Sequence, residues 1–379
     1  MNKSASIISG RLVSLDVFRG ITIAGMILVN NPGSWGYVYA ALGHAEWHGW
    51  TPTDLIFPFF LFIVGVAISL SLTKRLKSGA THLSIFLKVL RRSIILFALG
   101  LFLSFLARCI VPKFDISHIR IPGVLQRIAI CYFFSALIFI KTNWKGRAII
   151  TVTLLAFYWA MMKLYPVPGY GPGVLTLKGN LCTYIDNLLL KGHMYKPNFD
   201  PEGIFSTIPA IATTLSGVLV GDWIHSTRSH LRKIAGLFVV GNFAILAGII
   251  MDAWLPINKQ LWTSSYTVFT SGMAMVCFAM CYYIIEIKGY KRWAVPFTAM
   301  GMNAIAMFVG NGLMVRLLSF WKITEPDGSQ LTSLTYAYRH FFVPIAGNLN
   351  GSLLYAIVMV LLWIGIAAIL YRKKIFIKI

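Results

Sequence analysis

Ten apolar runs of about 20 residues follow one another along this chain, and they constrain its fold more than any other feature. Each run is long enough to cross the roughly 30 Å hydrocarbon core of a bilayer as a helix. Because 57% of the 379 residues are hydrophobic and only 12% are charged, a soluble globular class is excluded. We therefore predict an all-α polytopic membrane helix bundle with spans at 12–31, 53–73, 92–110, 123–140, 147–165, 205–224, 234–255, 263–285, 294–318 and 352–371.

One shorter apolar segment, 339–348, contains Pro344 and Gly347 and is expected to be re-entrant, interfacial or an eleventh span. No cleavable signal is expected, because the first apolar run follows a short polar stretch, 1–10. The whole chain, 1–379, is predicted to form one transmembrane domain. A long extramembrane segment, 166–204, is rich in Pro, Gly and Asn, and loops of that length inside a compact domain are commonly functional.

Basic residues gather at alternate ends of the apolar runs. Most of the 34 Lys and Arg residues lie in six clusters that the positive-inside rule assigns to the cytoplasm, so both termini are predicted to be cytoplasmic. The acidic residues on that side are only Asp16, Asp222 and Glu286. The net charge of +22 does not indicate nucleic-acid binding, because the basic residues flank membrane spans and do not form one soluble face. The same clusters could hold the phosphates of an anionic cofactor.

The segment between the first two runs contains His44, Glu46, His48 and Asp54 but no Lys or Arg. Its lack of basic residues predicts an extracytoplasmic position, and its titratable side chains indicate chemistry. The sequence TPTD at 51–54 predicts a helix start in which Asp54 is a capping residue. His44 and His48 have helical spacing, but no third ligand is nearby, so no metal site is predicted.

Two other pairs of charged residues have simple local interpretations. The sequence DPEG at 200–203 predicts the start of the sixth span with Asp200 as N-cap, which leaves Glu202 free for another role. Asp16 and Arg19 are three residues apart within the first run, so they are expected to face and neutralise each other.

Arg127 lies within the fourth run without an acidic neighbour in the sequence. An intramembrane charge is unfavourable unless it meets an anion or lines a wet cavity, so Arg127 is predicted to be functional. Asn303 and Asn311 are either core amides or residues that line a ligand channel. Cys109 and Cys182 both fall toward the outer side, so a disulfide is conceivable, although no cysteine pattern supports it.

Six ordered sequence blocks carry a family resemblance. They are RLVSLDVFRGITIAGMILVN, GHAEWHGWTPTDLIFPFFLFIVG, RIPGVLQRIA, FDPEGIFSTIPAI, NKQLWTSSYTVFTSGMAM and PFTAMGMNAIAMFVG. The chain resembles the heparan-α-glucosaminide N-acetyltransferase family, as a bacterial-type member without the N-terminal lumenal segment. The resemblance implies a multi-span enzyme that moves an acetyl group from cytosolic acetyl-CoA to the amine of a terminal glucosamine or related amino sugar on the far side.

The resemblance also implies roles for individual residues. The family's catalytic histidine, in an H-A-x-W element, falls on His44, which would act as a general base or as a carrier of the acetyl group. The asparagine after the first span falls on Asn30, which could donate to an oxyanion. Asp54 or Glu202 could orient the imidazole or hold the acceptor ammonium. Candidate acceptor-binding residues are Glu46, His48, Asp200 and Glu202. Candidate residues for the donor channel are Arg127, Trp262, Ser264, Ser265, Asn303 and Asn311.

Alternative functions stay open at this point. One is an O-acetyltransferase that acts on a surface polysaccharide or lipid, and another is a transporter or flippase without acyl transfer. The expected location is a bacterial inner membrane, with the His44 segment facing the periplasm. The expected partners are acetyl-CoA, an amino-sugar or glycan acceptor, the lipid bilayer and a second copy of the chain. The residues after Asn30, and His48, depart from the family pattern, so the acceptor's identity stays open.

Overall fold

The computed structural model describes residues 11–110 and 118–377 and consists almost entirely of helices. Within these residues, nine helices are long and apolar enough to cross a membrane, and a bent helix pair forms a tenth span. The predicted fold class is therefore confirmed, the chain is an integral membrane protein, and the predicted ten spans are reached if the bent pair counts as one span. Residues 1–10, where no cleavable signal was expected, lie outside the described residues.

The spans fall on either side of the long extramembrane segment. Those before it are α1 (Val13–Asn30), α2 (Ile56–Lys77), α3 (His82–Cys109), α4 (Val124–Lys141) and α5 (Trp144–Leu164). Those after it are α7 (Thr207–His225), α8 (His230–Asp252), α9 (Ser264–Tyr282), the pair α10 (Val295–Met302) and α11 (Ala304–Phe320), and α13 (Val343–Arg372). The third span begins at His82 and not at residue 92, because Thr81 caps it by accepting a hydrogen bond from the Ser84 amide at 3.3 Å.

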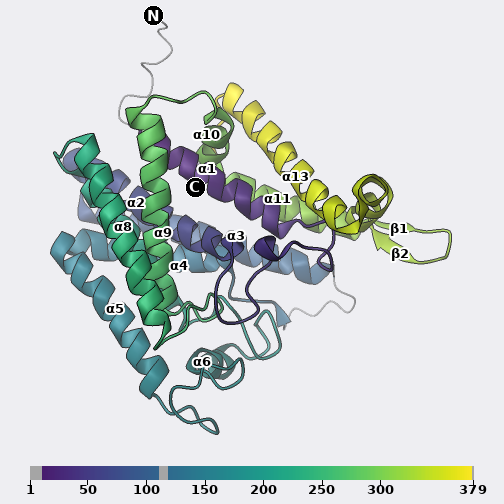
Figure 1. Ribbon diagram of the computed structural model, residues 1–379, viewed down its shortest axis with the longest axis horizontal. Coiled ribbons are helices and arrows are strands. Elements are labelled where there is room, and N and C mark those ends of the chain that lie inside the picture. Colours follow the sequence, from purple (N-terminus) through teal and green to yellow (C-terminus); the bar gives the residue numbers. More distant parts are fainter. Residues whose placement is uncertain (1–10, 111–117, 378–379) are drawn as a thin grey trace, which may run out of the picture.

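Close helix packing depends on glycines. Figure 1 shows α5, α8 and α9 on one side of the molecule and α13 on the other, with α1 and α11 between them in this view. A Cβ added at Gly65 of α2 would lie 1.9 Å from the Thr214 carbonyl oxygen of α7. A Cβ added at Gly217 of α7 would lie 2.0 Å from the Phe62 carbonyl oxygen of α2. The two backbones can approach this closely only because both positions lack a side chain.

The last two spans are not straight helices. The α10 and α11 axes meet at 81° beside Asn303. The segment 339–348 is not a separate span, because it continues from a π-helical turn, Tyr338–Phe342, into the start of α13. Within α13, Gly347 has φ 71° and ψ −178°, a conformation that glycine adopts without steric penalty, and the helix bends there. Beside it, the hairpin of β1 (Lys322–Thr324) and β2 (Gln330–Thr332) projects at the edge of Figure 1, followed by α12 (Ser333–Ala337).

Three extramembrane segments meet at one end of the bundle. The long segment is partly helical, because α6 (Leu181–Leu190) forms within it. The Trp47 indole donates to the Leu175 carbonyl at 2.8 Å, which joins the segment after α1 to the long segment. The Gly49 amide donates to the Ile257 carbonyl at 2.7 Å, which joins it to the α8–α9 loop.

Two local predictions have clear outcomes in the structure. Asp16 is buried and interacts with the Arg19 guanidinium at 3.4 Å, so the predicted neutralisation is confirmed. Arg11 is a second partner, at 2.5 Å. Cys109 and Cys182 are free thiols, and the Cys182 sulfur lies 3.1 Å from the Tyr158 hydroxyl instead.

Candidate active site

Asp54 is the centre of a hydrogen-bonded cluster at the start of α2. It lies in the short helix Pro52–Leu55, and its Oδ2 accepts from the Thr51 amide at 3.0 Å, so the predicted capping role is confirmed. The same oxygen accepts from the Ala45 amide at 3.1 Å. The carboxylate is almost completely buried, so its position is determined by these protein donors.

His44 uses the second oxygen of this carboxylate. Its Nδ1 lies 2.7 Å from Asp54 Oδ1, and its side chain is 42% exposed. Because a carboxylate only accepts hydrogen bonds, Nδ1 carries the proton in this pair and Nε2 keeps its lone pair. The geometry therefore orients the imidazole so that Nε2 is the nitrogen able to accept a proton.

Lys259 completes the cluster and was not singled out from the sequence. Its Nζ lies 3.1 Å from both ring nitrogens of His44 and 3.8 Å from Asp54 Oδ1. Burial lowers the pKa of Lys259, whereas the nearby carboxylates of Glu202 and Asp54 raise it. The sequence signal that could have identified it is a single Lys beside the α9 start, in the block NKQLW, on the side with few basic residues.

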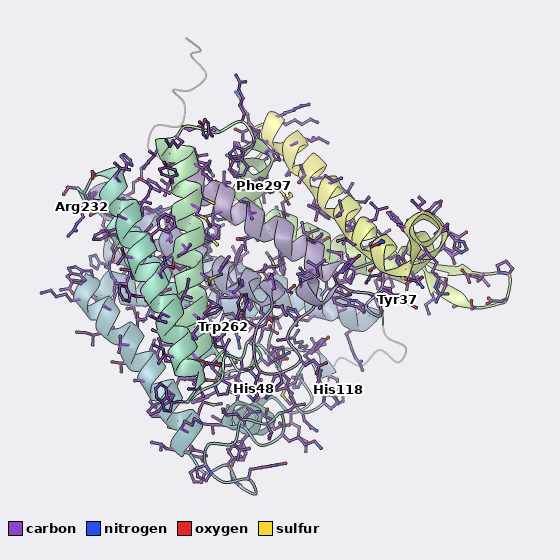
Figure 2. All side chains as sticks on the ribbon, viewed as in Figure 1. Tyr37, His48, His118, Arg232, Trp262 and Phe297 are labelled. Carbon is purple, nitrogen blue, oxygen red and sulfur yellow. The ribbon has the colours of Figure 1, made fainter. Side chains whose placement is uncertain are left out.

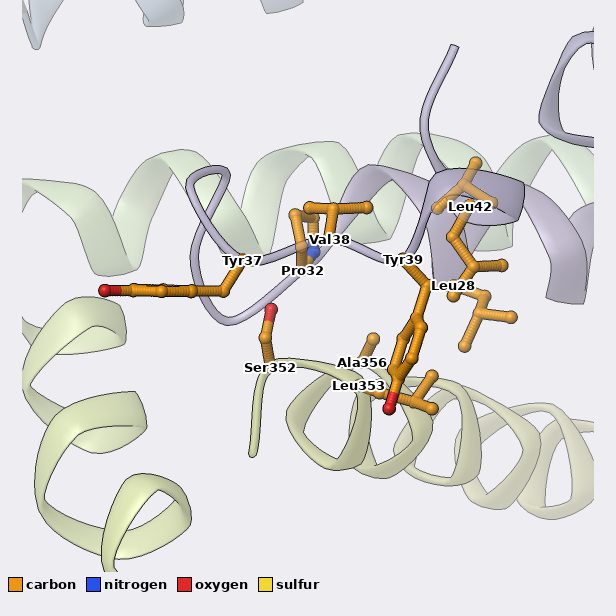
Figure 3. A pocket seen from close by; sticks show the side chains of 10 residues that line it. Leu28, Pro32, Tyr37, Val38, Tyr39, Leu42, Ser352, Leu353 and Ala356 are labelled. Atoms are coloured by element: carbon orange, nitrogen blue, oxygen red, sulfur yellow. The ribbon is translucent and has the colours of Figure 1, made fainter. Parts of the chain in front are cut away.

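The segment that carries His44 is held against α13. The Ser34 amide donates to Ser352 Oγ at 3.1 Å, and the Tyr39 hydroxyl donates to Asn350 Oδ1. Figure 3 shows the apolar side chains of this segment above Leu353 and Ala356 of α13, around a small pocket. These contacts begin just after the bend at Gly347, so the bend helps to position the His44 segment.

The other residues predicted near His44 are also exposed. Asn30 is exposed at the C-terminal end of α1, and the hydrogen bonds of His44 do not include it. Glu46 is also exposed. His48 Nδ1 lies 3.4 Å from the Asn258 side-chain amide, and burial lowers the pKa of His48. Figure 2 shows His48 toward the same end of the molecule as Trp262, far from Arg232 at the start of α8.

The prediction that Asp200 caps the sixth span is wrong. The helix begins at Thr207, with Ser206 as the preceding residue. Asp200 instead binds the Arg120 guanidinium through both oxygens, at 2.8 and 2.7 Å, and Glu202 binds the same guanidinium. Burial alone would lower the pKa of Arg120, but these two carboxylates together raise it. Asp200 thus forms a bidentate ion pair with a residue 80 positions away, and it also accepts from the Glu202 amide at 2.9 Å within a local turn.

Arg127 is buried, and its contacts lie beneath the Glu202 segment. Its Nη2 donates to the Gly203 carbonyl at 3.0 Å and to Ser206 Oγ at 2.5 Å, and its guanidinium lies 5.1 Å from the Trp262 ring centre. Its Nε and Nη1 lack hydrogen-bond partners among the described residues. Arg127 therefore supports the loop that carries Glu202.

Trp262, Ser264 and Ser265 are buried at the start of α9 and bond to protein groups. The Trp262 indole donates to Thr213 Oγ1 at 3.1 Å, and Ser264 Oγ donates to the Leu155 carbonyl at 2.8 Å. Ser265 Oγ lies 3.0 Å from Thr263 Oγ1. These three residues therefore have protein partners in the described structure.

Asn303 and Asn311 lie elsewhere, in the broken span. At the break, the Asn303 side chain donates to the Ile375 carbonyl at 3.2 Å and accepts from the Ile377 amide at 2.8 Å. It thereby ties the C-terminal segment to the break. Asn311 is mostly buried in α11, and its Oδ1 lacks a partner among the described residues. The six predicted channel residues therefore fall into two separate groups.

A basic cavity lies between α2, α3 and α4. It has a volume of about 400 Å³, and the guanidinium of Arg92 lies 4.8 Å from the ring centre of Tyr132 in its wall. The sequence indicated these basic residues only as topology signals and as possible phosphate ligands. The cavity is lined by Ser71, Leu72, Arg75, Ile85, Lys88, Val89, Arg91, Arg92, Ile95 and Tyr132. Across the described residues, no group of three or more His, Cys, Asp or Glu side chains could hold a metal ion.

The fold and this cluster define a multi-span α-helical membrane protein with an oriented histidine between its first two spans. Residues 11–249 match the family model described as heparan-alpha-glucosaminide N-acetyltransferase, catalytic, and the chain belongs to this family. The human protein named heparan-alpha-glucosaminide N-acetyltransferase is 31% identical over 97% of this chain and 60% of its own length. The mouse protein of that name is 30% identical over 98% of this chain and 61% of its own length. The chain thus spans about 60% of the length of these curated relatives.

Proposed function

We propose that this protein is a transmembrane N-acetyltransferase that moves an acetyl group from acetyl-CoA to the amine of a terminal glucosamine or related amino sugar. The observation that carries the proposal is the 2.7 Å contact between His44 Nδ1 and the buried Asp54 carboxylate. It presents a neutral imidazole Nε2 at the face where the extramembrane segments meet. Membership of the family and the names of the relatives supply the reaction class.

In this proposal His44 is a general base. An amine attacks a thioester only through its neutral form, so a group that removes its proton during the attack lowers the barrier. Asp54 keeps the proton on Nδ1 and stabilises the imidazolium that forms at His44. Direct transfer requires donor and acceptor to be bound together, whereas an acetyl-histidine carrier would allow the donor's thiol to leave first.

The phosphates of acetyl-CoA are proposed to bind in the basic cavity. Arg75, Lys88, Arg91 and Arg92 line it, and guanidinium and ammonium groups are the usual partners of phosphate oxygens. All four belong to clusters that the positive-inside rule assigns to the cytoplasm. The protein would then take its donor from the cytosol and present the acetyl group to His44 on the other side, for instance at the periplasmic face of a bacterial inner membrane.

The acceptor is proposed to bind at the carboxylates near His44. Asp54 Oδ1 lies 3.8 Å from Lys259 Nζ, and Glu202 is a second carboxylate that raises the pKa of this lysine. Glu202 is paired with Arg120, together with Asp200, and Glu46 and His48 are exposed on the His44 segment. Carboxylates of this kind can hold the ammonium and hydroxyl groups of an amino sugar. A second copy of the chain is a proposed partner.

The test is acetyl transfer by purified protein in detergent. Labelled acetyl-CoA is supplied with amino sugars, or with hydroxyl sugars that lack an amine, and the wild type is compared with His44→Ala. The matched control is His340→Ala, which removes an exposed histidine that pairs with Glu325 beside the β1–β2 hairpin. We expect transfer to amines that His44→Ala abolishes and His340→Ala preserves.

Other outcomes would contradict the proposal. Transfer to hydroxyl sugars alone would identify an O-acetyltransferase. Sugar flux across liposomes without acetylation would identify a transporter. Transfer that persists in His44→Ala would refute the role of His44.

A further inference from the structure

Lys259 lies in a loop whose backbone is fixed by side-chain contacts on both sides of it. It lies in the α8–α9 loop, where the Asn258 side-chain oxygen accepts from the Leu261 amide at 2.8 Å. Trp262, near the end of this loop, has φ 53°, a left-handed conformation that side-chain-bearing residues rarely adopt. Trp262 keeps it because its ring is fully buried against Phe57 and Tyr266. Residues held in such conformations are concentrated at functional sites.

The contacts of Lys259 are not those of a simple counter-ion. Its Nζ is closer to the two nitrogens of His44, at 3.1 Å, than to Asp54 Oδ1, at 3.8 Å. The Asp54 carboxylate already accepts hydrogen bonds from His44 Nδ1 and from the backbone amides of Ala45 and Thr51. An ammonium has three donors, so Lys259 has capacity left for a group that binds beside His44 Nε2.

An atom that exchanges a proton with His44 Nε2 must come within about 3 Å of that nitrogen. In acetyl transfer this atom is the nitrogen of the acceptor amine. The carbonyl carbon that the nitrogen attacks is one bond further from Nε2, and the carbonyl oxygen is bonded to that carbon. Because Lys259 Nζ is 3.1 Å from Nε2, a donor is already in the region where negative charge develops on that oxygen. A cation that is already in place beside such charge stabilises it without reorganisation.

We propose that Lys259 is a catalytic residue whose ammonium donates to the acetyl oxygen in the tetrahedral intermediate, an inference that rests on the acetyl transfer proposed above. The ammonium of Lys259 turns from His44 Nε2 to the acetyl oxygen as the substrates bind. The acceptor nitrogen forms a bond to the carbonyl carbon, the C=O electron pair moves to this oxygen, and His44 Nε2 takes the amine proton. Collapse re-forms C=O, breaks the C–S bond and releases the CoA thiolate, which recovers the proton from His44. In this proposal Lys259 has the role of oxyanion donor, which the sequence suggested for Asn30.

The test replaces and then restores the cation. Lys259→Met removes the charge while keeping a side chain of similar length, and Lys178→Met is the matched control at an exposed lysine of the long segment. Because the interaction is made in the transition state, Lys259→Met should lower kcat by about 10²- to 10³-fold, with the KM for acetyl-CoA within about twofold. Lys178→Met should match the wild type.

Restoration uses Lys259→Cys. Treatment with 2-bromoethylamine creates a lysine-like ammonium and should recover a large part of kcat, whereas iodoacetamide, which adds a neutral amide, should not. Wild-type protein treated with each reagent corrects for reaction at the native cysteines. If Lys259→Met does not fold, the two modified forms of Lys259→Cys still test whether the ammonium is needed, because both start from one folded preparation.

Three results would overturn the assignment. The first is a Lys259→Met kcat within threefold of the wild type, and the second is equal recovery with both reagents. If either occurs while the wild type transfers acetyl and His44→Ala does not, only the role of Lys259 fails. Absence of transfer by the wild type would reject the proposed function and this inference together.

Discussion

Replacing Asp54 by Asn tests whether the buried carboxylate is needed to orient His44. Asp54 Oδ1 lies 2.7 Å from His44 Nδ1, and Oδ2 accepts from the amides of Ala45 and Thr51 at 3.1 and 3.0 Å. An asparagine has one oxygen for these two sets of donors. If that oxygen faces His44, its NH2 group meets the two backbone N–H groups, and if it faces the backbone, the NH2 group meets Nδ1. The wrong tautomer of His44 is then favoured, or the helix start is disrupted.

The expected loss can be estimated from these contacts. A positioned general base contributes about 10²- to 10⁴-fold to a rate, so Asp54→Asn should lower kcat within that range, equivalent to about 3 to 5 kcal/mol in the barrier. Unpaired backbone donors cost about 1 to 3 kcal/mol each where they are buried, so thermal stability should also fall. The two effects are separated when kcat is divided by the folded fraction from size-exclusion chromatography.

The assay measures initial rates of transfer from labelled acetyl-CoA to glucosamine, with both substrates saturating. Asp327→Asn, at an exposed aspartate of the β1–β2 hairpin, is the matched control and should match the wild type. The reasoning about His44 would be refuted if the Asp54→Asn protein, equally folded, kept a kcat within threefold of the wild type.

Four further changes have expected outcomes. Burial raises the pKa of Asp186 to about 6 in the folded protein. As pH rises through about 4 to 6, this carboxyl ionises in the unfolded state before it ionises in the folded state, so the wild type should lose roughly 3 kcal/mol of stability. Asp186→Asn should abolish this loss in melts at pH 4 and 7, and an unchanged pH dependence would contradict it. Gly65→Ala puts a Cβ 1.9 Å from the Thr214 carbonyl and should lower Tm by several degrees, whereas Gly365→Ala, with no atom within 4 Å, should not. The double variant Arg75→Ala, Lys88→Ala should raise the KM for acetyl-CoA about tenfold or more, unlike Lys291→Ala, and an unchanged KM would exclude this cavity as the phosphate site. Without an acceptor, direct transfer predicts no exchange of label between acetyl-CoA and free CoA, and His44-dependent exchange would instead indicate an acetyl-histidine.

Much of the fold could be predicted because each crossing of a bilayer imposes a local rule. A segment that crosses must be apolar over about 20 residues and must satisfy its own backbone by forming a helix. The spans were therefore visible in the sequence, although the bend at Asn303 was not. That break depends on the C-terminal segment, whose backbone at Ile375 and Ile377 is bound by the Asn303 side chain.

The candidate site was only partly predictable. The start of α2 followed from the local sequence at 51–54, and the structure confirms it. The same argument failed for Asp200, because its carboxylate binds Arg120 and the amides of Tyr195 and Glu202 in a turn that ends before the helix begins at Thr207. A local pattern states which contacts a residue is able to make, whereas the partners that reach it in the fold decide which ones it makes.

The sequence by itself determined the class of this protein, because apolar run length and the alternation of charge are properties of single segments. The sequence also identified His44 as the candidate catalytic residue, through its resemblance to a known family. Only the tertiary structure decided which groups surround that histidine. Lys259 is 215 residues away in the chain, and its ammonium reaches both ring nitrogens because the α8–α9 loop is bound to the His44 segment through Gly49. Contacts over such separations depend on how helices and loops pack together, and no spacing within a segment encodes them.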